Sequence, residues 1–289
     1  MTAEEVLKNA LDKNTSDIFL IPGLPLSYKI NGKIIHQTEH KMSVDNIDKI
    51  IGEIYRMANN RDMKSAHTSG DDDFSFAIPG LSRFRANIFK QRGSFAAVLR
   101  VITFELPKYD ELGIPKSVVD ISSLTKGFVL VTGSAGSGKS TTLSCIIDVI
   151  NRTRNAHVIT IEDPIEFLHI HDKSVITQRE IGVDTEGYDA AMRAALRQAP
   201  DVILLGEMRD YETIRTAMTA AETGHLVIST LHTIGAANTI DRIIDAFPPN
   251  QQQQIRIQLS MVLKAVVSQQ LVPTVSDNVI PSFEVMFLN

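Results

Sequence analysis

The sequence predicts an α/β fold in which a P-loop domain follows a smaller α+β domain. In the second part of the chain, short apolar segments alternate with helical patterns, which is typical of a mostly parallel sheet covered on both faces. One of these segments, residues 128–132, runs into a glycine-rich turn with the spacing G-x-x-x-x-G-K-[ST]. The first part instead combines a hairpin signal with two amphipathic helical segments. These observations indicate two domains of different architecture.

The composition is typical of a globular protein. The 289 residues are 43% hydrophobic and 22% charged, and this length allows two domains of about 100–200 residues each. No apolar run approaches the roughly 18 residues that cross a bilayer, and the charged N-terminus does not resemble a signal peptide, so we expect a cytoplasmic protein. The single cysteine, Cys145, excludes a disulfide framework and a cysteine zinc site. The net charge of −5 argues against broad binding to nucleic acid.

The N-terminal part of the chain, residues 1–103, predicts the small α+β domain. Thr2 and Glu5 have the spacing of a capping box at the start of a helix. Asn31 and Gly32 form a strong hairpin signal between two strand patterns. The expected helices are residues 2–13 and 43–57, and the expected strands are residues 17–20, 26–30, 33–37, 83–88 and 94–102.

The strand over residues 83–88 carries two arginines. Period-two alternation places Arg83 and Arg85 on one face of the strand and the apolar residues on the other. Periodicity alone favours a solvated strand face for both arginines. The following stretch, residues 104–115, is interrupted by prolines and a glycine and lacks clear periodicity. We therefore expect it to be the interdomain linker.

Residues 116–289 carry the alternating pattern of the P-loop domain. Ligands of such sheets bind at the carboxyl ends of the strands, so the residues that follow each strand are the candidates for chemistry. Polar groups follow all four predicted strands: the glycine-rich turn, an acidic cluster, a lone glutamate and a histidine. The expected strands are residues 128–132, 157–161, 201–205 and 226–230.

The glycine-rich turn predicts a site for a nucleotide triphosphate. Its backbone N–H groups can close around phosphates, and the helix that follows adds the positive end of its dipole. We expect Lys139 to reach the β- and γ-phosphates of ATP and the Ser140 hydroxyl to hold Mg²⁺. The nucleotide-binding residues expected in this turn are Ser134, Ala135, Gly136, Ser137, Gly138, Lys139, Ser140 and Thr141.

The acidic residues after two other strands are candidates for hydrolysis. Phosphoryl transfer to water needs a divalent cation and a group that orients the attacking water. Glu207 ends a buried strand, where it could hold Mg²⁺ through water. Glu162, Asp163 and Glu166 form a second acidic cluster that could supply the catalytic base, and the pattern leaves open which of them does so. The alternative for each acid is a solvated strand cap.

Two histidines flank the predicted strand over residues 226–230. His232 emerges at its carboxyl end, where a γ-phosphate sensor or relay would lie. His225 precedes the strand and is equally consistent with a structural histidine.

Four segments in this order resemble the Walker A, Asp box, Walker B and His box motifs of secretion-superfamily ATPases. They are residues 133–142, 160–167, 205–210 and 223–233. The resemblance is strongest to the PilT-type retraction ATPases of type IV pili and covers nearly the whole chain. It implies a RecA-like ATPase domain over residues 116–289, a PAS-like N-terminal domain over residues 1–103 and a homo-hexameric ring.

The resemblance also implies roles for individual residues. Arg83 and Arg85 match N-terminal-domain arginines that approach the γ-phosphate, which replaces the solvated-face interpretation. Asp163 and His225 are expected at the nucleotide. The implied function is an ATP-hydrolysing motor for pilus retraction and twitching motility, acting on a pilus platform protein in the inner membrane. Such a motor has only a peripheral membrane contact and does not bind nucleic acid directly.

Departures from the family pattern and competing functions complete the sequence-based expectations. Gln198 and Ala199 stand where the family usually has an acidic pair, and Phe19 stands where a histidine is frequent. The chain ends at Asn289, so we expect the family's C-terminal helical region to be largely absent.

Pilus-assembly and type II secretion ATPases are an alternative, although a single cysteine cannot build their four-cysteine zinc module. A nucleotide-responsive adaptor without catalysis and a DNA-translocating motor are two further alternatives.

Overall fold

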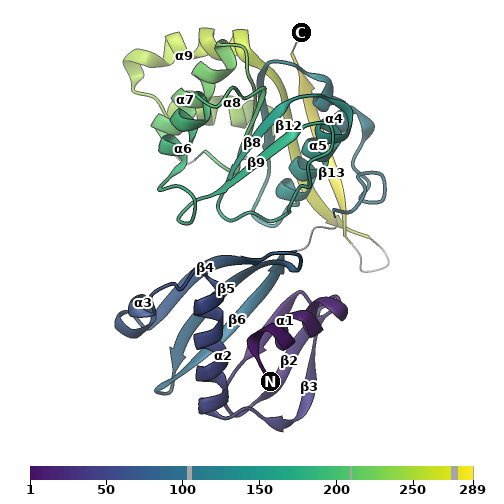
Figure 1. Cartoon of the computed structure of the whole chain (residues 1–289). Helices are drawn as coiled ribbons and strands as arrows, with labels where there is room; N and C mark the ends of the chain where they lie inside the picture. Colours follow the sequence, from purple (N-terminus) through teal and green to yellow (C-terminus); the bar gives the residue numbers. More distant parts are fainter. Residues whose placement is uncertain (103–105, 209, 275–278, 289) are drawn as a thin grey trace. The chain divides into compact units, whose positions relative to one another are not determined.

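A computed structural model describes residues 1–102, 106–208, 210–274 and 279–288 of the chain. The chain divides into two compact units, Met1–Phe104 and Glu105–Asn289 (Figure 1). The predicted domain boundary at residue 103 and the first two residues of the predicted linker lie outside the described residues.

The described part of the first unit is a six-stranded sheet in which all neighbouring strands are antiparallel. Its strand order is β3-β2-β1-β6-β5-β4. The strands are β1 (Asp17–Leu20), β2 (Pro25–Ile30), β3 (Lys33–Lys41), β4 (Asp71–Ile78), β5 (Ser82–Gln91) and β6 (Ser94–Ile102), and the helices are α1 (Ala3–Asp12), α2 (Val44–Met57) and α3 (Lys64–Thr68).

Local sequence signals account for most of this unit. The capping box of Thr2 and Glu5 is present at the start of α1, and the Ser43 side chain caps α2. Four isoleucines of α2 are buried in the core, and burying each contributes about 1.5–3 kcal/mol. Strand β4 and helix α3 were not predicted from the sequence, and β3 extends four residues beyond its predicted end at residue 37.

Strand β5 shows the predicted alternation. Phe84, Ala86 and Ile88 are buried in the core that α1 and α2 cover. Arg83 and Arg85 therefore lie on the opposite face of the sheet, and both are partly exposed.

The described part of the second unit is a seven-stranded sheet of order β13-β12-β7-β11-β10-β8-β9. Its strands run parallel except for β13, which is antiparallel to β12. The strands are β7 (Gly127–Thr132), β8 (His157–Glu162), β9 (Val175–Glu180), β10 (Val202–Leu205), β11 (Leu226–Leu231), β12 (Leu263–Pro273) and β13 (Val279–Phe287). The helical segments are α4 (Lys116–Val119), η1 (Asp120–Ser123), α5 (Lys139–Thr153), α6 (Tyr188–Ala195), α7 (Tyr211–Glu222), α8 (Ala236–Asp245) and α9 (Pro249–Val262).

Both faces of this sheet are covered, as the near-continuous apolar strands predict. Figure 1 shows α4 and α5 on one face and α6 to α9 on the other. Alternate residues of β7 enter the two cores: Val129 and Val131 pack with α5, whereas Phe128 and Leu130 pack with α6 to α9. The predicted α/β class and the four predicted strands are confirmed. Strands β9, β12 and β13 were not predicted from the sequence.

The predicted linker over residues 104–115 is largely part of the second unit. Leu106, Tyr109 and Leu112 pack against the core beneath α4 and α5, and Ile114 is buried there. These apolar side chains outweigh the proline and glycine signals that indicated a linker. Residues 106–115 therefore belong to the second unit.

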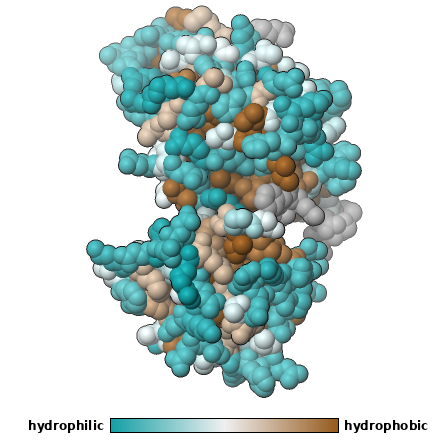
Figure 2. Space-filling view, in the orientation of Figure 1, coloured by the Kyte–Doolittle hydropathy of each residue, from teal (hydrophilic) through white to brown (hydrophobic). Residues whose placement is uncertain are grey.

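Because the apolar residues are buried in two cores, a mostly hydrophilic outer surface is expected. Figure 2 shows that hydrophilic residues dominate the visible face of both units. Within the described ranges, no helix has both the length and the apolar character to span a bilayer.

Candidate nucleotide-binding site

The carboxyl ends of four parallel strands meet around one cavity of the second unit. Strand β7 pairs with β11, β11 with β10, and β10 with β8, so the residues that follow these strands share one edge of the sheet. The cavity at this edge has a volume of about 220 Å³. Its lining residues are Ala135, Gly136, Lys139, Ser140, Leu143, Ser144, Glu162, Asp163, Pro164, Glu166, Tyr188, Leu204, Gly206, Glu207, Thr230 and His232.

The glycine-rich turn after β7 packs tightly against β12. A Cβ atom on Gly133 would overlap the backbone oxygen of Gln269, and one on Gly138 would lie 2.9 Å from the Gln269 Nε2 atom. Both glycines have positive φ angles, +147° and +87°, which side chains disfavour. The Gln269 side chain is buried and accepts a hydrogen bond from the Thr142 hydroxyl at 2.8 Å. Gln269 therefore supports the turn from beneath.

Lys139 is a buried cation at the base of this turn. Its Nζ atom donates hydrogen bonds to the carbonyl oxygens of Gly133 and Ser134, both at 2.8 Å. Burial lowers the pKa of Lys139, whereas the carboxylates of Glu207 and Glu166 act in the opposite direction. The lysine is thus held between the turn and the acidic side of the cavity.

The residues present fit a triphosphate with a divalent cation. Helix α5 begins at Lys139, and no side chain caps its first turn, so its N–H groups and dipole favour an anion. The Ser137 hydroxyl is buried and has no hydrogen-bond partner among the described residues. Ser140 and the carboxylate of Glu207 line the cavity, and hydroxyl and carboxylate oxygens suit Mg²⁺.

The end of β8 and the acidic loop that follows it, residues 163–174, contribute carboxyl groups in two different environments. Glu162 is partly buried, and its Oε1 atom accepts a hydrogen bond from the Thr160 hydroxyl at 2.6 Å. Burial raises the pKa of Glu162 to about 7, and the neighbouring charge of Glu166 adds to the rise, while the hydrogen bond from Thr160 opposes it. Asp163 and Glu166 are exposed. The cavity therefore holds a carboxyl group that exchanges its proton near neutral pH beside exposed carboxylates.

Glu207 and His232 follow neighbouring strands and form a pair. The Nε2 atom of His232 lies 3.2 Å from the Oε2 atom of Glu207. The Thr230 hydroxyl donates to the Gly206 carbonyl at 2.6 Å, which ties the ends of β11 and β10 together. The predicted convergence of Lys139, Glu207 and His232 at one edge is present.

Not every predicted residue of the turn lines the cavity. Ala135, Gly136, Lys139 and Ser140 do so. The other predicted residues of the turn, which lie outside the lining, are Ser134, Ser137, Gly138 and Thr141.

His225 is the predicted site residue that the structure places elsewhere. It precedes β11, at the opposite end of the strand from His232, and its Nδ1 atom lies 2.9 Å from the Ala220 carbonyl. Because β11 is fully extended over six residues, its two ends are about 20 Å apart. The structure thus places His225 away from this cavity with the contacts of a structural histidine, and its expected contact with a nucleotide stays a prediction.

Arg83 and Arg85 belong to β5 of the first unit. The Nε atom of Arg85 donates to the Oδ1 atom of Asp73 at 3.1 Å. The side chain of Arg85 is 38% exposed, so this ion pair lies at the surface.

Several residues that shape the cavity carry no motif that identifies them in the sequence. Gln269 belongs to β12, a long and mostly apolar strand that was not predicted from the sequence. Gln178 and Glu180 of β9 contact the acidic loop, and their alternation in that strand was the available signal. Tyr188 lines the cavity from α6, and no motif marks it.

Family models and individual relatives of this chain indicate the same family. The family described as "Type II/IV secretion system protein" matches residues 1–282. The chain is 42% identical to the type IV pilus retraction ATPase PilT of Pseudomonas aeruginosa, over 99% of this chain and 82% of the relative. It is also 42% identical to a twitching motility protein of Neisseria gonorrhoeae, over 98% of this chain and 75% of the relative.

Solved structures agree with these sequence relatives. A crystal structure of the pilus retraction motor PilT with bound ADP has a TM-score of 0.91 and 44% identity, covering 100% of this chain and 84% of that one. The ATPase DotB of Legionella pneumophila has a TM-score of 0.85 and 29% identity, covering 100% of this chain and 82% of that one. The fold of this chain is thus that of the PilT and DotB ATPase structures.

Proposed function

Because this chain belongs to the type II/IV secretion system protein family, we propose that its P-loop unit hydrolyses ATP to drive the retraction of type IV pili. The observation that carries the proposal is the cavity in which buried Lys139 faces the carboxylates of Glu207 and Glu166 beside a glycine-rich turn. The relatives named for pilus retraction and twitching motility support the biological role.

The proposed chemistry is stabilisation of a phosphoryl transfer to water. Lys139 and the N–H groups of the turn bind the phosphates of ATP, and Ser140 and Glu207, the latter through water, hold Mg²⁺. When bound, Mg²⁺ offsets negative charge on the phosphate oxygens. Glu162 or Glu166 orients the attacking water, and His232 links Glu207 to the γ-phosphate region.

Further residue roles and the assembly state rest on the family resemblance. Arg83 and Arg85 supply positive charge to the γ-phosphate, and Asp163 contacts the nucleotide. The active form is a homo-hexamer at the inner face of the cytoplasmic membrane, where it acts on a platform protein of the pilus. Its membrane contact is peripheral.

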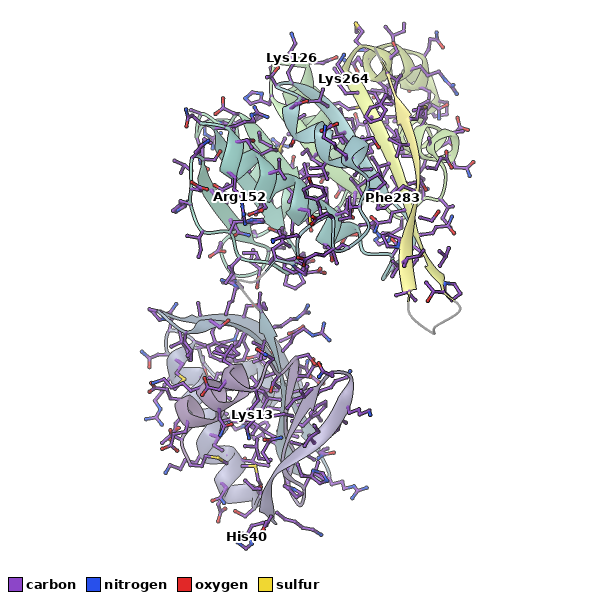
Figure 3. The ribbon with its side chains drawn as sticks, turned by 90° about the vertical axis from the view of Figure 1, so that its right-hand side faces the viewer. Lys13, His40, Lys126, Arg152, Lys264 and Phe283 are labelled. Carbon is purple, nitrogen blue, oxygen red and sulfur yellow. The ribbon has the colours of Figure 1, made fainter. Side chains whose placement is uncertain are left out.

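Phosphate release by the purified chain tests the enzymatic part. We expect steady ATP hydrolysis that Lys139→Ala abolishes while circular dichroism stays unchanged. Lys126→Ala is the matched control, because Lys126 precedes β7 and lies with Lys264 at one end of the sheet (Figure 3), whereas the turn follows the other end of β7. Stoichiometric ATP binding without turnover by the unmodified chain would instead identify a nucleotide-responsive adaptor.

A count of surface pili tests the direction of force. Deletion of the gene is expected to leave more pili and abolish twitching, and the unmodified gene, but not its Lys139→Ala version, is expected to restore twitching. A deletion strain without pili would identify an assembly ATPase instead.

A further inference from the structure

Strand β9 lies at the edge of the second sheet, directly beside the strand that leads into the acidic loop. In the parallel pairing of β8 and β9, Gln178 lies opposite Thr160 and Glu180 lies opposite Glu162. Side chains alternate along a strand, so Gln178 and Glu180 share one face of the sheet with Glu162. The loop that carries Glu166 crosses this face, as its hydrogen bonds to Gln178 and Glu180 demonstrate.

The amide group of Gln178 holds the loop at two places. Its Nε2 atom donates to the Phe167 carbonyl at 2.9 Å, and its Oε1 atom accepts from the His169 N–H at 2.8 Å. The same Nε2 atom lies 3.4 Å from the Oε1 atom of Glu162. The Gln178 side chain thus connects Glu162, the last residue of β8, with the backbone that follows Glu166.

Glu180 holds the same loop on the other side of Glu166. Its side chain is buried, and its Oε2 atom accepts a hydrogen bond from the Ile165 N–H at 3.0 Å. The Asp184 carboxylate in turn accepts from the Glu180 N–H at 2.8 Å, which fixes the end of β9. Glu166 is therefore flanked by backbone groups that β9 side chains bind, at Ile165 and at Phe167.

We propose that Gln178 and Glu180 are positioning residues for ATP hydrolysis that hold the acidic loop so that Glu162 and Glu166 stay at the cavity. This inference rests on the proposed ATPase function of the same site. The loop has no helix or strand between β8 and β9, so these side chains supply much of its fixed geometry. A displacement of about 1 Å in a catalytic group can lower turnover about 10²-fold, whereas Lys139 and the turn are anchored independently of β9.

The experiment separates turnover from binding. Gln178→Met keeps the length of the side chain and removes its hydrogen bonds, and we expect kcat to fall about 10- to 100-fold. The affinity for a fluorescent ATP analogue is expected to change less than about 3-fold, because a residue that acts on the chemical step alone leaves ground-state binding intact. Thr177→Val is the matched control: Thr177 is the adjacent residue on β9, and its hydroxyl lies 3.0 Å from the Nε2 atom of His157.

A second pair of variants tests the acceptor role of Glu180. Glu180→Gln retains an oxygen for the Ile165 N–H, so its kcat is expected within about 3-fold of the unmodified chain, whereas Glu180→Met is expected to resemble Gln178→Met. A Gln178→Met variant with unmodified kcat would overturn the proposal, as would equal losses of kcat in Glu180→Gln and Glu180→Met. If Gln178→Met does not fold, Gln178→Glu replaces it in the test. This variant keeps the acceptor for the His169 N–H but loses the donor to the Phe167 carbonyl. Its kcat must fall for the proposal to stand. An unmodified chain that releases no phosphate would overturn both the proposed function and this inference.

Discussion

The Nε2 atom of His232 lies 3.2 Å from the Oε2 atom of Glu207, so the residues that follow β11 and β10 form one polar pair at the edge of the cavity. The side chain of Glu207 is 14% exposed and that of His232 is 56% exposed. The pair therefore joins a largely buried carboxylate near Lys139 to an imidazole that reaches solvent.

The first prediction concerns this pair. Glu207→Gln is expected to lower kcat at least about 100-fold, and His232→Ala about 10-fold, because the first removes a charge from the cavity and the second removes only its partner. If both act through the same hydrogen bond, the double variant is expected to be no slower than Glu207→Gln alone. Steady-state phosphate release measures all three variants. His40→Ala, an exposed histidine of β3, is the control, and additive losses in the double variant would contradict a shared role.

The second prediction concerns the contact between the P-loop and β12. Gly133→Ala places a methyl group against the Gln269 carbonyl and adds backbone strain, so we expect it to lower the free energy of unfolding by about 3 kcal/mol. Gly182 also has a positive φ angle, +80°, but a methyl group added there would meet open space. Gly182→Ala is therefore expected to lower the free energy of unfolding by only about 1 kcal/mol. Urea denaturation compares the two. Equal losses would mean that the Gln269 contact does not constrain the turn.

The third prediction concerns the pH dependence of stability. The pKa of Glu162 is about 7 in the folded chain, against an ordinary value of 4.5. Between these values the folded chain keeps a proton that the unfolded chain has released, so the free energy of unfolding falls as pH rises through this window. Glu162→Gln removes this dependence while keeping an acceptor for the Thr160 hydroxyl. We expect the variant to be more stable than the unmodified chain at pH 8, by on the order of 1–3 kcal/mol, and nearly equal at pH 5.

The measurement is urea denaturation of both chains across this pH range. Glu186→Gln, which neutralises an exposed carboxylate on the loop after β9, is the control and should leave the pH dependence unchanged. Stability curves of Glu162→Gln and the unmodified chain that run parallel from pH 5 to pH 8 would disprove the raised pKa.

The sequence predicted those parts of the fold and site that depend on local signals. The capping box of Thr2 and the apolar spacing of α2 act within a few residues, and the P-loop at Gly133 depends on one turn. The edge strands β9 and β13 were missed because their exposed sides interrupt the apolar pattern. Their place is set by neighbouring strands that are distant in sequence.

The missed site residues have the same cause. Gln269 reaches Thr142 across 127 positions of the chain, so no local pattern identifies their contact. His225 and His232 belong to one sequence motif, but the extended strand β11 places them at opposite ends. The linker was predicted from its proline residues, but the packing of Leu106 and Leu112 on a distant core depends on tertiary structure.

The last prediction concerns Arg85 and its partner Asp73. Their side chains are 38% and 43% exposed, and an exposed ion pair contributes at most about 1 kcal/mol to stability. Loss of this ion pair alone therefore costs little stability. If Arg85 stabilises the transferring phosphate, Arg85→Ala is expected to lower kcat about 10³-fold, whereas Asp73→Asn should leave kcat within about 3-fold. Arg100→Ala is the control, because Arg100 lies directly opposite Arg85 on the neighbouring strand. This substitution removes the same charge from the same face of the sheet. Steady-state phosphate release measures kcat of each variant. Equal losses of kcat in Arg85→Ala and Asp73→Asn would show that Arg85 is needed only as an ion-pair partner. An equal loss of kcat in Arg100→Ala would show that this face of the sheet acts through its general positive charge.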